Sequence, residues 1–296
     1  MKLKTIRGVN FKNKRVLVRV DFNCPIKNGR VIDDSRIKAA LPTIKYLIDK
    51  KAKVILISHL GEPLKNEKLH PALSAERRGK KTKNQKHILK IKKQYSLRPV
   101  YKNLKFKIKS LKFVDDCLGE KVRKAVEQME YGEVILLENL RFYPGEKQND
   151  LKFARELASL ADVYINDAFA VSHRAHASVS AITKFLPSYA GFLLEKEIKT
   201  LSEVLEKPRH PFIVLIGGAK ISTKIKVIEN LARKADKILL AGGLANTFFA
   251  SQSYPIGESL YEKEMVRVAK QLMGRFKEKL VLPIDVKIKS KFKVKS

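Results

Sequence analysis

Basic side chains follow short apolar runs at several places in the first half of the sequence. One run is followed by two imidazoles and a guanidinium, those of His173, Arg174 and His176, and another is followed by Arg141. Guanidinium groups hold carboxylate or phosphate in a two-pronged geometry, and imidazoles add positive charge when protonated. Cations at these positions therefore favour an anionic ligand.

Polar side chains also follow two earlier apolar runs. Asp21 and Asn23 come after the first run, His59 follows the second, and Arg36 lies at a predicted helix start. Taken singly, these fit a turn residue, a turn or cap, a packed histidine and a solvated helix residue, respectively. If the strands are parallel, however, all four converge at one edge of a sheet, and together they favour an anion site.

The second half contains two glycine pairs, each between an apolar run and a predicted helix. Glycine allows backbone N–H groups to converge at a helix start, and lysines nearby would add positive charge for phosphate binding. Each pair alone also fits a tight turn required by packing, and there is no Walker sequence and no GxGxxG. The candidate nucleotide-binding residues are Gly217, Gly218, Lys220, Lys224, Gly242 and Gly243.

Alternating apolar runs and amphipathic segments predict the elements that must position these residues. Strands are expected over 15–20, 53–58, 133–137, 162–166, 211–216, 237–241 and 279–283. Helices are expected over 34–50, 121–130, 151–160, 223–234 and 265–277. Strand–helix alternation of this kind predicts an α/β fold with two doubly wound, Rossmann-like parallel sheets, of which the second is incomplete.

Two domains are expected from this pattern. Residues 1–184 would form an N-terminal domain and 206–296 a partial second domain, joined by a hinge helix over 185–205 that Pro208 and Pro211 stop. A lysine-rich segment at about 72–95 breaks the alternation and is interpreted as an exposed insertion or a frayed basic helix.

Composition places the chain among globular proteins, with 296 residues of which 44% are hydrophobic. No apolar stretch approaches the roughly 18 residues that span a bilayer, and the basic start lacks the apolar region of a signal peptide. We therefore expect a cytoplasmic monomer that does not bind membranes. Cys24 and Cys117 have no partners at zinc spacing and are expected to be reduced, packed thiols.

The net charge of +32 attracts nucleic acid, acidic membranes and small anions alike. Because lysine is spread over the whole sequence, a solvated basic surface is the simplest interpretation. Charge alone therefore does not choose among these ligands.

Six motifs, in order along nearly the whole chain, resemble those of phosphoglycerate kinase. They are 18–25 (VRVDFNCP), 33–37 (DDSRI), 58–61 (SHLG), 138–142 (ENLRF), 173–176 (HRAH) and 217–220 (GGAK). The resemblance implies reversible transfer of a phosphoryl group from ATP to the carboxylate of 3-phosphoglycerate, giving 1,3-bisphosphoglycerate and ADP in glycolysis.

The resemblance also implies roles for the candidate residues. Lys220 and Lys224 would face the nucleotide phosphates, and two lobes would close about the hinge. A carboxylate acceptor is already ionised and needs no general base, so Arg36 and Lys220 are expected to stabilise the transferring group, with Mg²⁺ bridging nucleotide oxygens. No metal ligands from the protein are predicted. The residues that would hold phosphoglycerate are Asp21, Asn23, Arg36, His59, Arg141 and Arg174.

The chain departs from the family pattern at Glu62, where the pattern has arginine. Two unit charges about 4 Å apart interact by roughly 1 kcal/mol in water and about 4 kcal/mol at an intermediate dielectric constant. We therefore expect repulsion of phosphoglycerate and poor affinity for it.

The family's second lobe also continues further than this sequence does, which suggests a C-terminally truncated or divergent member. We expect uncovered apolar sheet surface in the second lobe and weak or absent activity, unless another chain completes the lobe. The alternative is a catalytically decayed basic protein of the same fold that binds nucleic acid. The absence of aromatic residues interleaved with the lysines counts against that alternative.

Overall fold

The computed structural model describes residues 3–63 and 83–287, and for 83–88 it describes the backbone alone. The first part of the basic insertion predicted at about 72–95 lies outside the described residues, and the rest forms a helix, α2 (Lys83–Tyr95). The chain divides into two compact units, Met1–Lys199 and Thr200–Ser296, which are described separately below.

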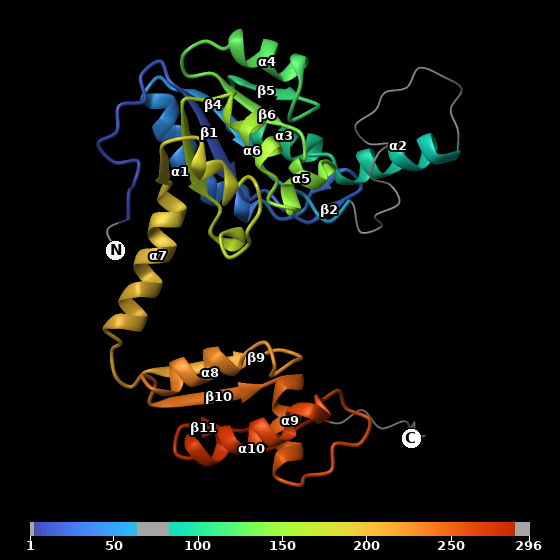
Figure 1. Ribbon diagram of the computed structural model, residues 1–296, viewed down its shortest axis with the longest axis vertical. Helices are drawn as coiled ribbons and strands as arrows, with labels where there is room; N and C mark the ends of the chain where they lie inside the picture. The colour runs from blue at the N-terminus through green and yellow to red at the C-terminus, as the bar shows by residue number, and fades with distance from the viewer. Residues whose placement is uncertain (1–2, 64–82, 288–296) are drawn as a thin grey trace. The chain divides into compact units, whose positions relative to one another are not determined.

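The first unit is built on a six-stranded sheet in the order β5-β6-β4-β1-β7-β8 (Figure 1). Every pair of neighbouring strands in it is parallel. The carboxyl ends of all the strands therefore meet at one edge, where open α/β sheets bind ligands. The strands are β1 (Arg15–Val20), β4 (Lys53–Ile57), β5 (Leu111–Val114), β6 (Val134–Leu137), β7 (Val163–Asp167) and β8 (Ser188–Ala190).

Helices cover both faces of this sheet, because successive strand side chains point to opposite sides. In β1, Val16 and Val18 pack in the core with Ile37 of α1, whereas Leu17 packs in the opposite core with Phe153 of α6. The doubly wound arrangement predicted for this half is confirmed. The helices are α1 (Ser35–Asp49), α3 (Arg98–Lys105), α4 (Glu120–Glu127), α5 (Pro144–Lys147), α6 (Leu151–Ala158) and α7 (Phe192–Glu206).

Short elements complete the first unit, most of them near the carboxyl edge of the sheet. A two-stranded hairpin follows β1, and three 3₁₀ turns follow β6 and β7. They are β2 (Ile26–Lys27), β3 (Arg30–Val31), η2 (Leu140–Phe142), η3 (Phe169–Val171) and η4 (Ala181–Lys184).

Helix α7 begins later than the predicted hinge helix over 185–205. Ser188–Ala190 forms β8, which pairs with β7, so this segment is extended rather than helical. The helix starts at Phe192 and ends at Glu206, two residues before Pro208. Proline therefore limits its C-terminal end, as the sequence predicts.

The second unit contains a three-stranded parallel sheet in the order β11-β10-β9. Its helices cover one face, where Ile216, Ile238 and Leu240 are buried. The elements are β9 (Ile213–Gly217), α8 (Ile225–Ala232), β10 (Lys237–Ala241), α9 (Gly243–Ser251), η5 (Lys263–Met265), α10 (Val266–Arg275) and β11 (Leu280–Val281).

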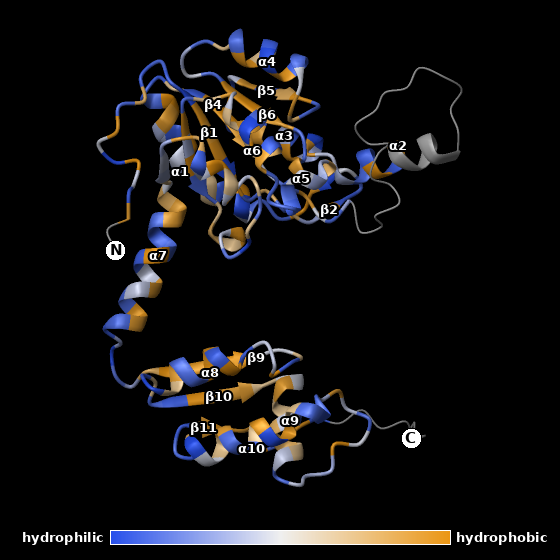
Figure 2. Ribbon diagram, in the orientation of Figure 1, coloured by the Kyte–Doolittle hydropathy of each residue, from blue (hydrophilic) through white to orange (hydrophobic). Residues whose placement is uncertain are grey.

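The other face of this sheet exposes apolar side chains. The ribbon of β9 and of most of β10 has the hydrophobic colour in Figure 2. Leu215 of β9 is 70% exposed. Ile213 on the same strand, Leu239 on β10 and Val281 on β11 are exposed as well. Parallel sheets are usually covered on both faces, so this surface is unusual. The apolar surface predicted from the sequence is present.

No helix among the described residues combines the length and apolarity that crossing a membrane requires. Both cysteines are buried and unpaired, as predicted. Burial raises the pKa of the Cys24 thiol to about 11 and that of Cys117 well above its ordinary value, so neither is a reactive thiolate at neutral pH.

Asp167, at the end of β7, is fully buried and fixes the start of α7. Its Oδ1 accepts hydrogen bonds from the backbone N–H groups of Leu193 at 2.8 Å and Leu194 at 3.3 Å. Burial raises the pKa of Asp167 to about 6. The folded state therefore binds more protons than the unfolded state between about pH 4 and 6, and this group's contribution to stability falls as pH rises through that window.

Asp167→Asn keeps the acceptor oxygen but cannot ionise. We expect its free energy of unfolding, relative to the unsubstituted protein, to rise by about 2 kcal/mol between pH 4.5 and pH 7, because pH 4.5 lies about 1.5 units below the pKa of about 6 and each unit corresponds to about 1.4 kcal/mol. Urea denaturation at both pH values measures this difference. Asp162→Asn is the matched control: hydrogen bonds from Arg15 outweigh burial and lower the pKa of Asp162, so its effect should be constant over this range. An equally constant effect of Asp167→Asn would contradict the prediction.

Candidate functional site

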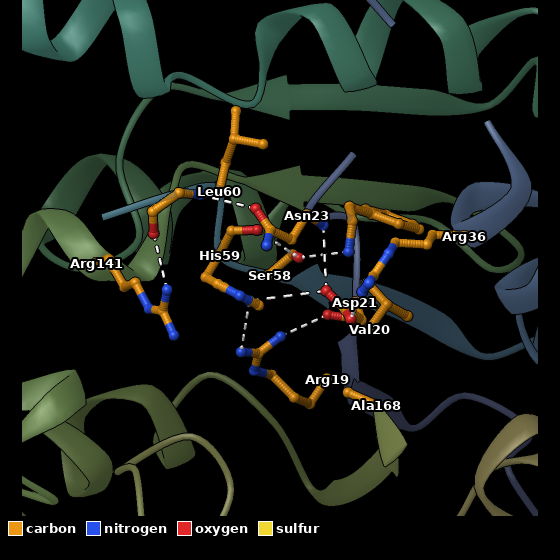
Figure 3. Close-up of polar contacts among 12 residues, drawn as sticks. Arg19, Val20, Asp21, Asn23, Arg36, Ser58, His59, Leu60, Arg141 and Ala168 are labelled. Atoms are coloured by element: carbon orange, nitrogen blue, oxygen red, sulfur yellow. Dashed lines mark hydrogen bonds and ion pairs between the residues drawn. The ribbon is translucent and has the colours of Figure 1, made fainter. Parts of the chain in front are cut away.

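Five of the predicted substrate-binding residues follow strands at the carboxyl edge of the first unit's sheet, and the sixth, Arg36, lies at the start of α1. Figure 3 shows all of them except Arg174. Asp21 and Asn23 follow β1, His59 follows β4, Arg141 lies in η2 after β6, and Arg174 follows η3 after β7. The chain order reverses around β1, whose neighbours are β4 and β7. This is the switch point at which doubly wound sheets bind ligands.

Asp21 connects three of the predicted residues. It accepts a hydrogen bond from the Arg36 guanidinium of α1, and its Oδ1 lies 3.9 Å from Nδ1 of His59. The same oxygen accepts a hydrogen bond from the backbone N–H of Asn23 at 3.2 Å. The side chain of Asp21 is nearly buried and that of Arg36 is 46% exposed. The carboxylate therefore orients a guanidinium that ligands can reach.

Gly61 joins the end of β1 to the turn after β6. Its N–H donates to Oδ1 of Asn23 at 2.9 Å, and its carbonyl accepts from Nη1 of Arg141 at 2.8 Å. Its φ is +59°, and a Cβ there would lie 2.5 Å from the Cε1 atom of Tyr95. Only glycine fits this position without rearrangement.

Arg141, Lys147 and Arg174 surround the carboxylate of Glu62. Nη1 of Arg141 donates to Oε1 at 2.7 Å, Nζ of Lys147 donates to Oε2 at 3.2 Å, and Nη1 of Arg174 lies 4.0 Å from Oε1. Arg141 is 3% exposed, and its Nε and Nη2 are buried without a hydrogen-bond partner. These unpartnered donors leave Arg141 with capacity to bind a further acceptor.

Arg19 is part of the same network, although the sequence analysis did not select it. This fully buried arginine of β1 donates from Nε to Oγ of Ser178 at 2.9 Å and from Nη2 to Nδ1 of His59 at 3.1 Å. Its Nη2 also lies 4.0 Å from Oε1 of Glu146, which is equally buried. The available signal was an arginine between Val18 and Val20 in an otherwise apolar strand. Glu146 and Lys147 carried no comparable signal.

The buried histidines of the site are neutral at physiological pH. Burial lowers the pKa of His59, and the nearby guanidinium groups of Arg19, Arg141 and Arg174 lower it further. Burial also lowers the pKa of His176, against the opposing effect of Glu146. Because a guanidinium only donates, Nδ1 of His59 is the acceptor from Arg19. The sequence interpretation that counted imidazoles among the cations is therefore wrong for His176.

In the second unit, the two predicted glycine turns lie against each other. Gly218 has a φ of +144° and Gly242 a φ of +69°, values that favour glycine. The carbonyl of Gly218 accepts from the N–H of Leu244 at 2.7 Å, and a Cβ on Gly242 would lie 3.2 Å from that carbonyl oxygen. The turns after β9 and β10 are thus fixed side by side, with Gly217 and Gly243 next to them.

The two predicted lysines follow the first of these turns. Lys220 is exposed, and Lys224 is the N-cap residue of α8. Between them, Ser222 donates from its N–H and its hydroxyl to Glu262 at 3.0 and 2.6 Å. This anchors the loop that carries both lysines.

Known proteins resemble this chain over nearly its whole length. A family model described as phosphoglycerate kinase matches residues 6–296. The chain belongs to the phosphoglycerate kinase family. The fold class and the enzyme class predicted from the sequence are confirmed, and the family supports ATP-dependent phosphoryl transfer to 3-phosphoglycerate rather than nucleic-acid binding.

Curated phosphoglycerate kinases are similar over almost the whole chain. The one from Pelotomaculum thermopropionicum is 46% identical over 97% of this chain and 68% of its own length, and the one from Moorella thermoacetica is 46% identical over 98% and 68%. Among solved structures, phosphoglycerate kinase from Coxiella burnetii has a TM-score of 0.74 at 36% identity and covers 96% of this chain and 66% of its own. The chain therefore spans about two thirds of the length of these phosphoglycerate kinases.

A buried carboxylate beneath the site gives a stability prediction. Glu146 is fully buried and accepts from the N–H and hydroxyl of Ser178 at 2.9 and 2.6 Å. Glu146→Ala leaves Arg19 buried without this carboxylate, and breaking a buried pair costs about 3–5 kcal/mol. Urea denaturation should show a loss of that size.

Glu156→Ala, on the exposed side of α6, is the matched control and should change stability by less than about 0.5 kcal/mol. Equal effects of the two substitutions would show that the buried carboxylate does not stabilise the site.

Proposed function

We propose that this chain holds 3-phosphoglycerate on its first unit and the phosphates of ATP or ADP on its second, and that it transfers the γ-phosphoryl group between them. The observation that carries the proposal is Arg141, a buried guanidinium with two unpartnered nitrogens. Arg174 lies near it beside Glu62, and Arg36 is held by Asp21 at the same edge of the sheet. Unpartnered buried donors among cations are suited to an anionic ligand.

The phosphoryl acceptor needs no general base from the protein. The carboxylate of 3-phosphoglycerate is ionised near neutral pH, so no side chain has to remove a proton from it. The protein has to align this carboxylate and neutralise charge on the transferring group. Arg36, held by Asp21 yet 46% exposed, is the first unit's candidate for this role, and Lys220 is that of the second unit.

The nucleotide phosphates are assigned to the paired glycine turns. Gly217, Gly242 and Gly243 let the two turns pack closely, Gly218 leaves the backbone open to close approach, and the lysines after the first turn add charge. Among the described residues there is no group of three or more His, Cys, Asp or Glu side chains that could hold a metal. Mg²⁺ would be held mainly by the nucleotide phosphates and water, where it would neutralise phosphate charge.

The remaining assignments follow from the same proposal. The small-molecule partners are 3-phosphoglycerate and ATP or ADP, and we propose a monomer that acts in the cytoplasm. Asp21, Asn23 and His59 would orient the substrate through hydrogen bonds.

Substitution of the two proposed catalytic residues tests this function. Arg36→Ala and Lys220→Ala should each lower kcat for ADP formation with 3-phosphoglycerate by about 10²- to 10³-fold, the effect of removing one preorganised charge-stabilising donor. A coupled assay of ADP release measures the rates.

Arg123→Ala on α4 and Lys226→Ala on α8 remove exposed cations of the same types and are the matched controls. Rates that are the same in the catalytic variants and these controls would refute the proposed roles. If the chain instead bound nucleic acid, affinity for DNA would fall steeply with salt and would not depend on Arg141.

A further inference from the structure

The positive charges at the carboxyl edge of the first unit's sheet are neutralised in two different ways. Arg19 lies beside Glu146, and both are fully buried, while Arg36 is held by Asp21. In each of these pairs, the carboxylate comes from a segment that the fold fixes in place. The carboxylates of Glu146 and Asp21 are therefore fixed structural counter-ions of the site.

The cations of Arg141, Lys147 and Arg174 are neutralised differently, because all three are directed at the single carboxylate of Glu62. Arg141 and Lys147 come from η2 and α5, which follow each other after β6, and Arg174 comes from the loop after η3, which follows β7. A carboxylate contacted by three cations from three segments is in the situation of a bound anionic ligand.

The backbone before Glu62 holds it at this place. Gly61 is fixed from one side by Asn23 and from the other by Arg141, through hydrogen bonds of 2.9 and 2.8 Å. The side chain of Glu62 therefore starts from a fixed point next to two of the predicted substrate-binding residues. Only its own side-chain torsions have to change for the carboxylate to leave the cations.

The contact is accessible to ligands from solution. The side chains of Glu62, Arg174 and Lys147 are 32%, 43% and 48% exposed. Exposed ion pairs are weak, typically below about 1 kcal/mol, so the outer part of this contact exchanges readily. The inner part, Arg141, is buried and keeps two nitrogens without partners.

We propose that the Glu62 carboxylate is an internal ligand of the anion site formed by Arg141, Lys147 and Arg174, and that an acidic group of the substrate binds there by displacing it. The identity of that substrate rests on the proposed function, but the competition does not. Through this competition, Glu62 lowers the affinity of the three cations for the substrate. At low substrate concentration the Glu62 carboxylate occupies the site, so the contact is autoinhibitory.

Isothermal titration of the full chain with 3-phosphoglycerate, and separately with inorganic sulfate, tests the competition. Glu62→Gln removes the charge at nearly constant size and should bind both anions about tenfold more tightly, which corresponds to about 1.4 kcal/mol. Glu195→Gln is the matched control, since Glu195 is also partly exposed and paired with an arginine, Arg7, away from the site. It should leave both affinities unchanged.

Glu62→Asp distinguishes displacement of a carboxylate that contacts the cations from electrostatic repulsion of the ligand without such contact. It keeps the charge but shortens the side chain by one methylene, so the contacts with the cations are weakened. Tighter anion binding by this variant than by the unsubstituted protein supports displacement of a contacting group. Affinity equal to that of the unsubstituted protein would overturn it, because the charge would then act without contact.

The outcomes separate this inference from the proposed function. Equal or weaker binding of both anions by Glu62→Gln overturns the inference, while the function stands if 3-phosphoglycerate still binds. If no variant binds 3-phosphoglycerate but sulfate binds more tightly to Glu62→Gln, the function fails and the internal ligand is supported. Thermal unfolding of each variant verifies that the fold is retained.

Discussion

A fully buried arginine in the central strand is the constraint on which the site depends. Arg19 cannot reach water, so its charge and donors must be satisfied by the protein. The groups that do so are Glu146, Ser178 and His59, which come from α5, the loop after η3 and the end of β4. Neutralising Arg19 therefore fixes the segments that carry Lys147, Arg174 and the loop of Glu62, and the substrate site follows from that arrangement.

Among the less deeply buried groups of the site, the cations outnumber the carboxylates that contact them. Arg36 has Asp21, whereas Arg141, Lys147 and Arg174 share Glu62. A local surplus of this kind in a partly buried place attracts anions far more specifically than the overall charge of +32, which is spread over the sequence. This distinction explains why net charge alone did not identify the ligand, whereas the placement of a few arginines did.

The sequence predicted elements well where the apolar pattern was uninterrupted. The bounds of β1 and β10 agree with the prediction, because both are mainly aliphatic and are followed by turn residues. Strand β5 was missed, since lysines surround its few apolar residues, and β8 was missed because three residues give no periodicity. The start of α7 was predicted too early because β8 was missed. Residues 188–190 are extended only because they pair with β7, which is a tertiary contact that the local sequence does not show.

At the site, the sequence predicted residues that follow strands but not those whose position depends on tertiary contacts. Residues after strand ends were predictable, since a parallel sheet brings those ends together whatever their side chains are. Glu146 and Lys147 lie on a short helix that is separated from β6 by η2, and only folding shows what they contact.

The charge state of the histidines is also a product of burial. Neutral His59 accepts from Arg19 and adds no charge of its own, so the positive field comes from guanidinium and ammonium groups, which stay charged across physiological pH. A site built in this way keeps its charge when pH changes near neutrality. Its affinity is then governed by the ionisation of the ligand and by the one carboxylate, Glu62, that occupies the same three cations.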